Sequence, residues 1–185
     1  LYIDFERALN TDFAKRVGLD TTSKDFIYVN PSSIEDGFTV IFRLLSKLDE
    51  AEKKNKEIAY KQVLVIWDSI AASAPKVDMD TENSMANATM GVKAKTLSKN
   101  ITMLLESAGR KNVAFFFINQ LRQKMNTQPF QDPYVAPGGM AIPYYSSARI
   151  RLAMANKIKT AEKEIIGVEV KATVNKNHLL DFLLN

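Results

Sequence analysis

The sequence predicts an α/β fold, in which a mostly parallel sheet is flanked by helices on both faces and continued by an antiparallel extension at its end. Two runs, 62–67 and 113–118, are almost continuously apolar, as is typical of parallel strands that are covered on both faces. Runs with helical spacing of apolar residues alternate with the strands. The 185 residues are 46% hydrophobic and 25% charged, which indicates one globular domain over residues 1–185.

The first part of the chain alternates strands and helices. Residues 1–5 predict an apolar strand, and residues 11–17 predict a short helix that ends at Gly18. Residues 25–29 are rich in β-formers, and residues 33–54 have helical periodicity with an acidic first turn.

The second part holds one more helix, a loop and two more strands. Residues 90–108 predict an amphipathic helix that ends at Gly109. Residues 121–145 contain four of the six prolines and no sustained period, which predicts a long loop of the kind that is usually functional. The alternating runs 148–156 and 165–175 predict an antiparallel pair that finishes the sheet.

The composition excludes several classes of site. There is no cysteine, so disulfides, thiolate metal sites and thiol nucleophiles are excluded, and His178 is the only histidine that a Ser/His/Asp triad could use. No G-x-x-x-x-G-K-[ST] motif occurs, so no phosphate-cradling loop lies within these residues. The longest apolar run, 113–118, is far below the roughly 20 residues of a membrane span. We therefore expect a cytoplasmic protein without membrane contacts.

Charge is divided unevenly along the chain. Residues 1–82 carry 11 basic and 15 acidic side chains, whereas residues 83–185 carry 14 basic and six acidic ones. Between positions 83 and 131 seven basic residues face one acidic residue, Glu106. This bias favours a polyanion near the segment, and a solvated lysine-rich surface is the alternative.

Three predicted strands end in polar side chains, namely Glu6, Asp68 and Gln120. Ligands of open α/β sheets bind beyond the carboxyl ends of the strands, so these residues are the first candidates for a site. The sequence 66–69, Ile-Trp-Asp-Ser, has the form of a Walker B element, in which a fixed carboxylate holds Mg²⁺ directly or through water. The alternative for Asp68 is a cap of the following turn.

Six motifs stand out along the chain: Tyr2-Ile3-Asp4-Phe5-Glu6-Arg7-Ala8-Leu9, Val65-Ile66-Trp67-Asp68-Ser69-Ile70-Ala71-Ala72 with Pro75-Lys76, Met90-Gly91, Phe117-Ile118-Asn119-Gln120-Leu121-Arg122-Gln123-Lys124, Gly138-Gly139, and Tyr144-Tyr145-Ser146-Ser147-Ala148-Arg149. In their order and near-spacing the chain resembles the bacterial RecA recombinases over nearly all of its length. The resemblance implies a RecA-type P-loop NTPase core that starts after the Walker A loop, and hence an N-terminally truncated chain. Divergence elsewhere favours a phage or other distant member.

The resemblance implies an ATP site with Mg²⁺. Glu6 matches the glutamate that activates water, and Gln120 matches the glutamine that couples the γ-phosphate to the DNA loops. Asp68 matches the Walker B aspartate and so the Mg²⁺ ligand, directly or through water. Ser69 follows it in the same nucleotide-binding motif.

Three further residues match nucleotide contacts. Asn10 and Phe13 match positions that contact adenine, with a turn residue and a core aromatic as their alternative roles. Lys176 matches a lysine that reaches the ATP of the neighbouring subunit, and a solvated surface charge is its alternative. Pro143 and Val174 replace lysines of the family, which affects the expected activation across subunits.

The resemblance places the first DNA contact on the loop 78–90 and the helix after it. Met90 and Gly91 match the end of this loop. Lys95 stands where the family has arginine and could meet a phosphate as a point charge.

The second DNA contact is expected on residues 121–137. Arg122 and Lys124 would neutralise phosphates, and Phe130 would wedge at base steps unless it folds back onto the core. Gly138 and Gly139 would let the base of this loop bend.

The expected function is therefore that of a DNA-dependent ATPase of recombination, repair and the SOS response. It would form a homo-oligomeric helical filament on single-stranded DNA and exchange strands with double-stranded DNA. One alternative is another RecA-fold motor such as a ring helicase, against which the Met90-Gly91 and Gly138-Gly139 motifs argue. The other is a non-catalytic DNA-binding or filament module.

Overall fold

The computed structural model describes residues 1–55, 62–79, 91–109, 111–124, 128, 130 and 133–178. The chain divides into two compact units, Leu1–Ile142 and Pro143–Asn185. It has the predicted α/β class, with a parallel four-stranded sheet, flanking helices and antiparallel strand pairs.

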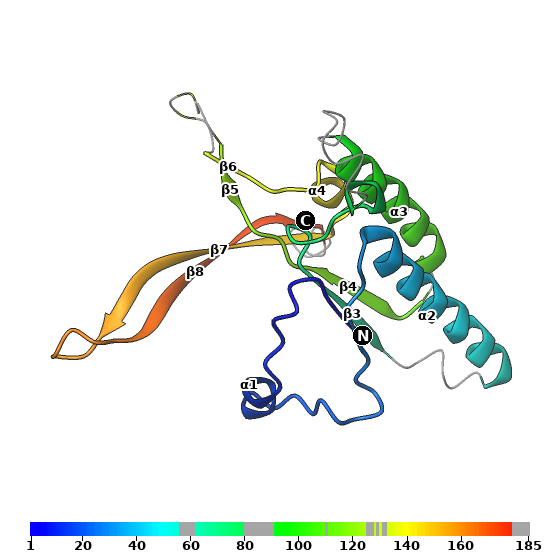
Figure 1. The fold of residues 1–185 in the computed structure, drawn as a ribbon, viewed down its shortest axis with the longest axis horizontal. Coiled ribbons are helices and arrows are strands. Elements are labelled where there is room, and N and C mark those ends of the chain that lie inside the picture. The colour runs from blue at the N-terminus through cyan, green and yellow to red at the C-terminus, as the bar shows by residue number, and fades with distance from the viewer. Residues whose placement is uncertain are drawn as a thin grey trace, which may run out of the picture. The chain divides into compact units, whose positions relative to one another are not determined.

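The first unit is built on the parallel sheet (Figure 1). Its strands lie in the order β2 (Tyr28–Val29), β1 (Tyr2–Asp4), β3 (Val63–Asp68) and β4 (Val113–Phe117). All three pairings are parallel, so the carboxyl ends of the strands share one edge of the sheet. The predicted strands are confirmed, although β2 is shorter than the run 25–29.

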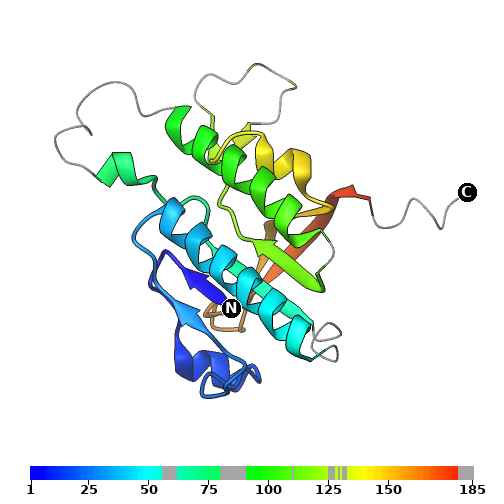
Figure 2. The ribbon, with the colours of Figure 1, turned by 90° about the vertical axis from the view of Figure 1, so that its right-hand side faces the viewer.

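Two long helices cover one face of this sheet. The helices α2 (Ile34–Lys54) and α3 (Val92–Ala108) pack beside each other, and Figure 2 shows both in front of the strands. The core between helices and sheet includes these fully buried side chains: Ile3, Phe38, Ile41, Val65, Trp67, Leu97 and Leu104. Leu64 and Phe116, whose side chains alternate to the opposite face, are 51% and 56% exposed. The expectation of helices on both faces is therefore wrong for the described part of this unit.

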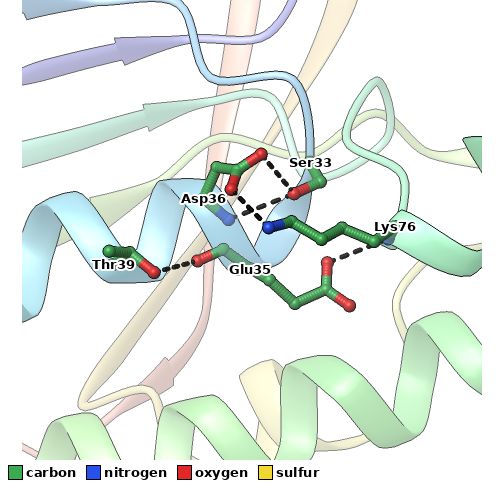
Figure 3. A network of polar contacts seen from close by, with 5 residues as sticks. All are labelled: Ser33, Glu35, Asp36, Thr39 and Lys76. Atoms are coloured by element: carbon green, nitrogen blue, oxygen red, sulfur yellow. Dashed lines mark hydrogen bonds and ion pairs between the residues drawn. The ribbon is translucent and has the colours of Figure 1, made fainter.

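The N-terminus of α2 is fixed by a polar network (Figure 3). The hydroxyl of buried Ser33 accepts from the backbone N–H of Asp36 and donates to its carboxylate at 2.7 Å. The ammonium of Lys76 lies 2.8 Å from the same carboxylate, while the backbone N–H of Lys76 donates to Glu35. The Lys76 contact lowers the pKa of Asp36 and raises that of Lys76. The network thus ties the segment that follows β3 to the start of α2.

A second contact between α2 and the sheet depends on the size of one residue. A Cβ atom at Gly37 would lie 2.7 Å from Cη2 of Trp67, so only glycine leaves room for the indole. The indole also stacks on Phe5 at a centroid distance of 4.8 Å and packs against Phe38 at 4.9 Å.

The segment 121–145 is more structured than a long loop. It contains the antiparallel strands β5 (Arg122–Gln123) and β6 (Tyr134–Val135), followed by the short helix α4 (Ala141–Tyr145). Elements of two to five residues leave no period in a sequence, so the loop prediction is wrong at these positions. The other short elements are α1 (Thr11–Arg16), as predicted, and a 3₁₀ turn at Lys76–Met79.

The second unit contains a long two-stranded ribbon. Strands β7 (Ala148–Lys159) and β8 (Ile165–Asn177) pair antiparallel, as the alternating pattern predicted. They form a sheet of their own, so the prediction that they finish the parallel sheet is wrong. The reason is that the described strands β7 and β8 form ladder hydrogen bonds only with each other.

Within the described ranges, no helix is both long enough and apolar enough to cross a membrane.

Candidate active site

Three strand ends meet at one carboxylate. Oε1 of Glu6, after β1, accepts a hydrogen bond from Ser69 Oγ, after β3, at 2.5 Å. The same oxygen accepts from Nε2 of Gln120, after β4, at 2.9 Å. Ser69 is fully buried, whereas Glu6 and Gln120 are exposed at the sheet edge. Two of the three strand-end residues that the sequence indicated, Glu6 and Gln120, are thus joined in one hydrogen-bonded group with Ser69, the residue that follows the third, Asp68.

Asp68 lies beside this group and next to a second carboxylate. Its backbone pairs with Asp4 in the parallel register, so both side chains project from the same face. Asp4 is 1% exposed and its two oxygens accept from the backbone amides of residues 6–9 and from the Tyr28 hydroxyl. Asp68 is only half-buried and accepts from the Tyr2 hydroxyl at 2.5 Å. Asp68 is therefore the carboxylate that can still take a cation.

The Tyr2 hydroxyl is held as a hydrogen-bond donor. Burial raises the pKa of this phenol, and the hydrogen bond to Asp68 and the negative charges of Asp68 and Asp4 raise it further. The phenol therefore keeps its proton at neutral pH and fixes Oδ2 of Asp68.

The donor chemistry at this edge fits Mg²⁺. Magnesium prefers hard oxygen ligands and is usually held by one or two carboxylates together with waters or substrate phosphates. Asp68 supplies such a carboxylate, and the next residue, Ser69, donates its hydroxyl hydrogen to the Glu6 carboxylate. No cluster of three or more acidic, histidine or cysteine side chains that could cage a metal occurs among the described residues. The site thus fits an ion that is completed by a phosphate ligand.

The two expected adenine contacts lie at the start of α1. Asn10 caps this helix, because its Oδ1 accepts from the backbone N–H of Phe13 at 2.9 Å. Asn10 therefore has a structural role as a helix cap, and its contact with adenine stays a prediction. Phe13 is 63% exposed, so it is not a core aromatic and its ring is open to stacking.

Two lysines lie in the first turns of α3, and one of them, Lys93, interacts electrostatically with Arg122 of β5. Lys95 is exposed on the first turns of α3. Lys93 is half-buried and its ammonium donates to the carbonyl of Ala71 at 3.0 Å. Burial and the charge of Arg122 lower the pKa of Lys93, while Asp78 opposes this shift. Sequence reasoning missed Lys93, since a single lysine in the first turn of a helix carries no distinguishing pattern.

The second expected DNA segment starts directly after the Glu6 group. Asn119 Nδ2 donates to the carbonyl of Pro137 at 2.8 Å, which joins the two ends of the segment. Arg122 and Lys124 are exposed in and beside β5. Phe130 is fully exposed, so it does not fold back onto the core.

The glycines of the expected DNA loops have different surroundings. A Cβ at Gly138 would lie 2.9 Å from Ile70 and Leu97 atoms, and one at Gly139 would lie 2.7 Å from the Ala94 Cβ. Both have positive φ, so packing and backbone conformation alone account for them. At the other loop, Gly91 precedes α3 with open space around it, and Met90 lies outside the described residues.

Lys176 is engaged within the second unit. Its ammonium donates to the carbonyls of Pro143 and Tyr144 at 3.1 and 2.6 Å. It therefore caps the last carbonyls of α4, a use that the sequence did not suggest.

Comparison with known proteins identifies the family. Residues 1–182 match the family described as RecA N-terminal domain. Protein RecA of Macrococcus caseolyticus is 31% identical over 177 residues, which are 95% of this chain and 45% of that protein. Protein RecA of Thermus aquaticus is 28% identical over 178 residues, and that of Mycoplasma mobile is 30% identical over 178 residues. Both of these matches cover 96% of this chain. The chain spans a little under half the length of these two relatives, 47% and 48% respectively. The chain belongs to the RecA family.

Proposed function

We propose that this chain is the hydrolytic and DNA-contacting core of a recombinase, a DNA-dependent ATPase that forms filaments on single-stranded DNA and exchanges strands. The observation that supports this proposal best is the shared contact of Ser69 and Gln120 with one oxygen of Glu6. This contact joins Glu6, whose carboxylate can act as a base, to Gln120, which directly precedes the expected DNA-binding segment 121–137.

On this proposal the residues divide the work of phosphoryl transfer. Glu6 orients and deprotonates the attacking water, and Asp68 holds Mg²⁺ with the help of Tyr2. When bound, the ion neutralises charge on the phosphates. Phe13 offers its exposed ring to the base.

Gln120 transmits the state of the nucleotide to the segment after it. Arg122, Lys124 and Lys95 would neutralise DNA phosphates, and Phe130 would stack on or wedge between bases. Lys176 would reach a nucleotide on a neighbouring subunit only after leaving the carbonyls of α4.

The test is ATP hydrolysis by the full-length gene product with and without single-stranded DNA, together with sedimentation of the DNA-bound protein. We expect hydrolysis that requires DNA and assemblies that grow with DNA length. Asp68→Asn should weaken Mg²⁺-dependent nucleotide binding, because the amide has no negative charge and offers the ion one oxygen instead of two. Asp20→Asn makes the same substitution at an exposed residue, so it is the matched control and should behave as the unmodified protein.

The alternatives predict different results. DNA binding without any hydrolysis would indicate a non-catalytic filament module. Closed rings that unwind duplexes would indicate a helicase-type motor. Either result would overturn the recombinase proposal.

A further inference from the structure

Asp4 is a buried carboxylate to which the proposed function assigns no role. It is 1% exposed, and it accepts five hydrogen bonds. Oδ1 takes the backbone amides of Glu6 and Arg7 at 3.0 and 2.7 Å. Oδ2 takes those of Ala8 and Leu9 at 3.0 and 3.1 Å, and the Tyr28 hydroxyl at 2.8 Å.

These contacts wrap the segment 6–9 around one carboxylate. Four successive amides that point at a single group need a tightly curved backbone, and Arg7 accordingly has φ of 55°. For any residue other than glycine, this left-handed conformation costs about 1 kcal/mol or more. The hydrogen bonds to Asp4 offset this strain.

The curved segment has an expected nucleotide contact at each end. Glu6 begins it, and Asn10 follows it as the cap of α1, with Phe13 one turn further on. The orientation of Glu6 toward Ser69 depends on where its backbone is held. The position of Phe13 depends on where α1 starts.

We propose that Asp4 is a positioning residue that sets the distance between the water-activating end and the base-binding end of the nucleotide site. This inference rests on the proposed function. It assigns to Asp4 no contact with the nucleotide, since its oxygens are occupied by the five donors.

The variant Asp4→Asn tests this proposal with little change in volume. An amide nitrogen cannot accept a hydrogen bond, so either the amides of Glu6 and Arg7 or those of Ala8 and Leu9 lose their partner. The control Asp20→Asn makes the same substitution at an exposed turn carboxylate, which binds Thr22 outside the proposed site.

The full-length gene product is assayed for kcat and KM with ATP and with GTP, and folding is followed by far-UV circular dichroism. We expect Asp4→Asn to lower kcat by about 10–100-fold, as misplacement of a reacting group does. It should also reduce the preference for ATP over GTP, which general loss of stability would not change in the folded fraction. Asp20→Asn should change neither.

The outcomes separate the two proposals. Hydrolysis by the unmodified protein with unchanged kcat and base preference in folded Asp4→Asn would overturn the positioning role alone. If Asp4→Asn does not fold, Tyr28→Phe removes one donor from Oδ2 and keeps the four amides. It should then lower kcat measurably, and an unchanged kcat would overturn the role. Absence of ATP binding and hydrolysis in the unmodified protein would overturn the proposed function and this inference with it.

Discussion

Asp4 and Asp68 start from paired positions on neighbouring parallel strands, yet only Asp68 keeps a carboxylate that solvent can reach. Five donors enclose Asp4, whereas the structure pairs Asp68 with the Tyr2 hydroxyl. Two acidic residues at the same edge of the sheet thus differ in burial and in hydrogen-bond partners. Asp4 holds the backbone of residues 6–9, and Asp68 keeps a partly exposed carboxylate.

The contact between Tyr2 and Asp68 should make stability depend on alkaline pH. The pKa of Tyr2 is raised from 10.0 in the folded state, so its stabilising effect is complete below pH 10. Above pH 10 the unfolded chain loses the phenolic proton first, and the free energy of unfolding should fall as the pH rises. Urea unfolding at pH 8 and pH 11, followed by Trp67 fluorescence, should show a smaller fall for Tyr2→Phe.

The control for this experiment is Tyr144→Phe, which makes the same change at an exposed tyrosine of the second unit. It should leave the fall unchanged. Equal falls in the unmodified protein and Tyr2→Phe would contradict the burial and hydrogen bonding of this phenol.

The fit of Gly37 against Trp67 should show as coupling between two substitutions. Gly37→Ala places a Cβ 2.7 Å from the indole and should lower the free energy of unfolding by about 1–3 kcal/mol. The effect should shrink when Trp67→Phe provides room. Denaturant unfolding followed by far-UV circular dichroism measures both single variants and the double variant. Additive effects would show that the two residues do not compete for space.

The basic segment should bind DNA through two separable effects. Replacing Arg122 and Lys124 by alanine should weaken binding to single-stranded DNA and flatten the logarithmic salt dependence by about 0.7 per lost phosphate contact. Phe130→Ala should weaken binding without changing the slope, because stacking releases no counterions. Fluorescence anisotropy of labelled DNA at several salt concentrations measures both.

A matched control removes two charges elsewhere. Lys47 and Lys53 are exposed on α2, and their replacement by alanine should leave affinity and slope nearly unchanged. An equal effect of the two double variants would show that net charge, and not this segment, accounts for binding.

Sequence reasoning found the elements with strong patterns. The apolar runs of β3 and β4, and the helical period of α2 with its acidic first turn, are local signals, and the structure confirms them. Glu6, Asp68 and Gln120 could be selected because each follows an apolar run, and parallel strands bring their carboxyl ends to one edge.

Other features depend on contacts that no local pattern records. Tyr2 binds Asp68 across 66 positions, and its spacing in the strand is that of any alternating residue. The four backbone amides that donate to Asp4 require a left-handed backbone conformation at Arg7, which no local sequence pattern indicates. Likewise, alternation predicts that β7 and β8 pair, but it does not predict that they form a separate sheet.

The central claim is that Glu6 activates water within the group that it forms with Ser69 and Gln120. Glu6→Gln tests it most directly, because the amide oxygen can still accept from both partners while the basic carboxylate is lost. Single-turnover hydrolysis and nucleotide binding are measured on the full-length gene product with single-stranded DNA, with Glu50→Gln as the control. We predict that hydrolysis falls by about 100-fold or more while nucleotide affinity stays within about twofold. Hydrolysis at the unmodified rate in Glu6→Gln, or an equal loss of binding and hydrolysis, would contradict the assignment.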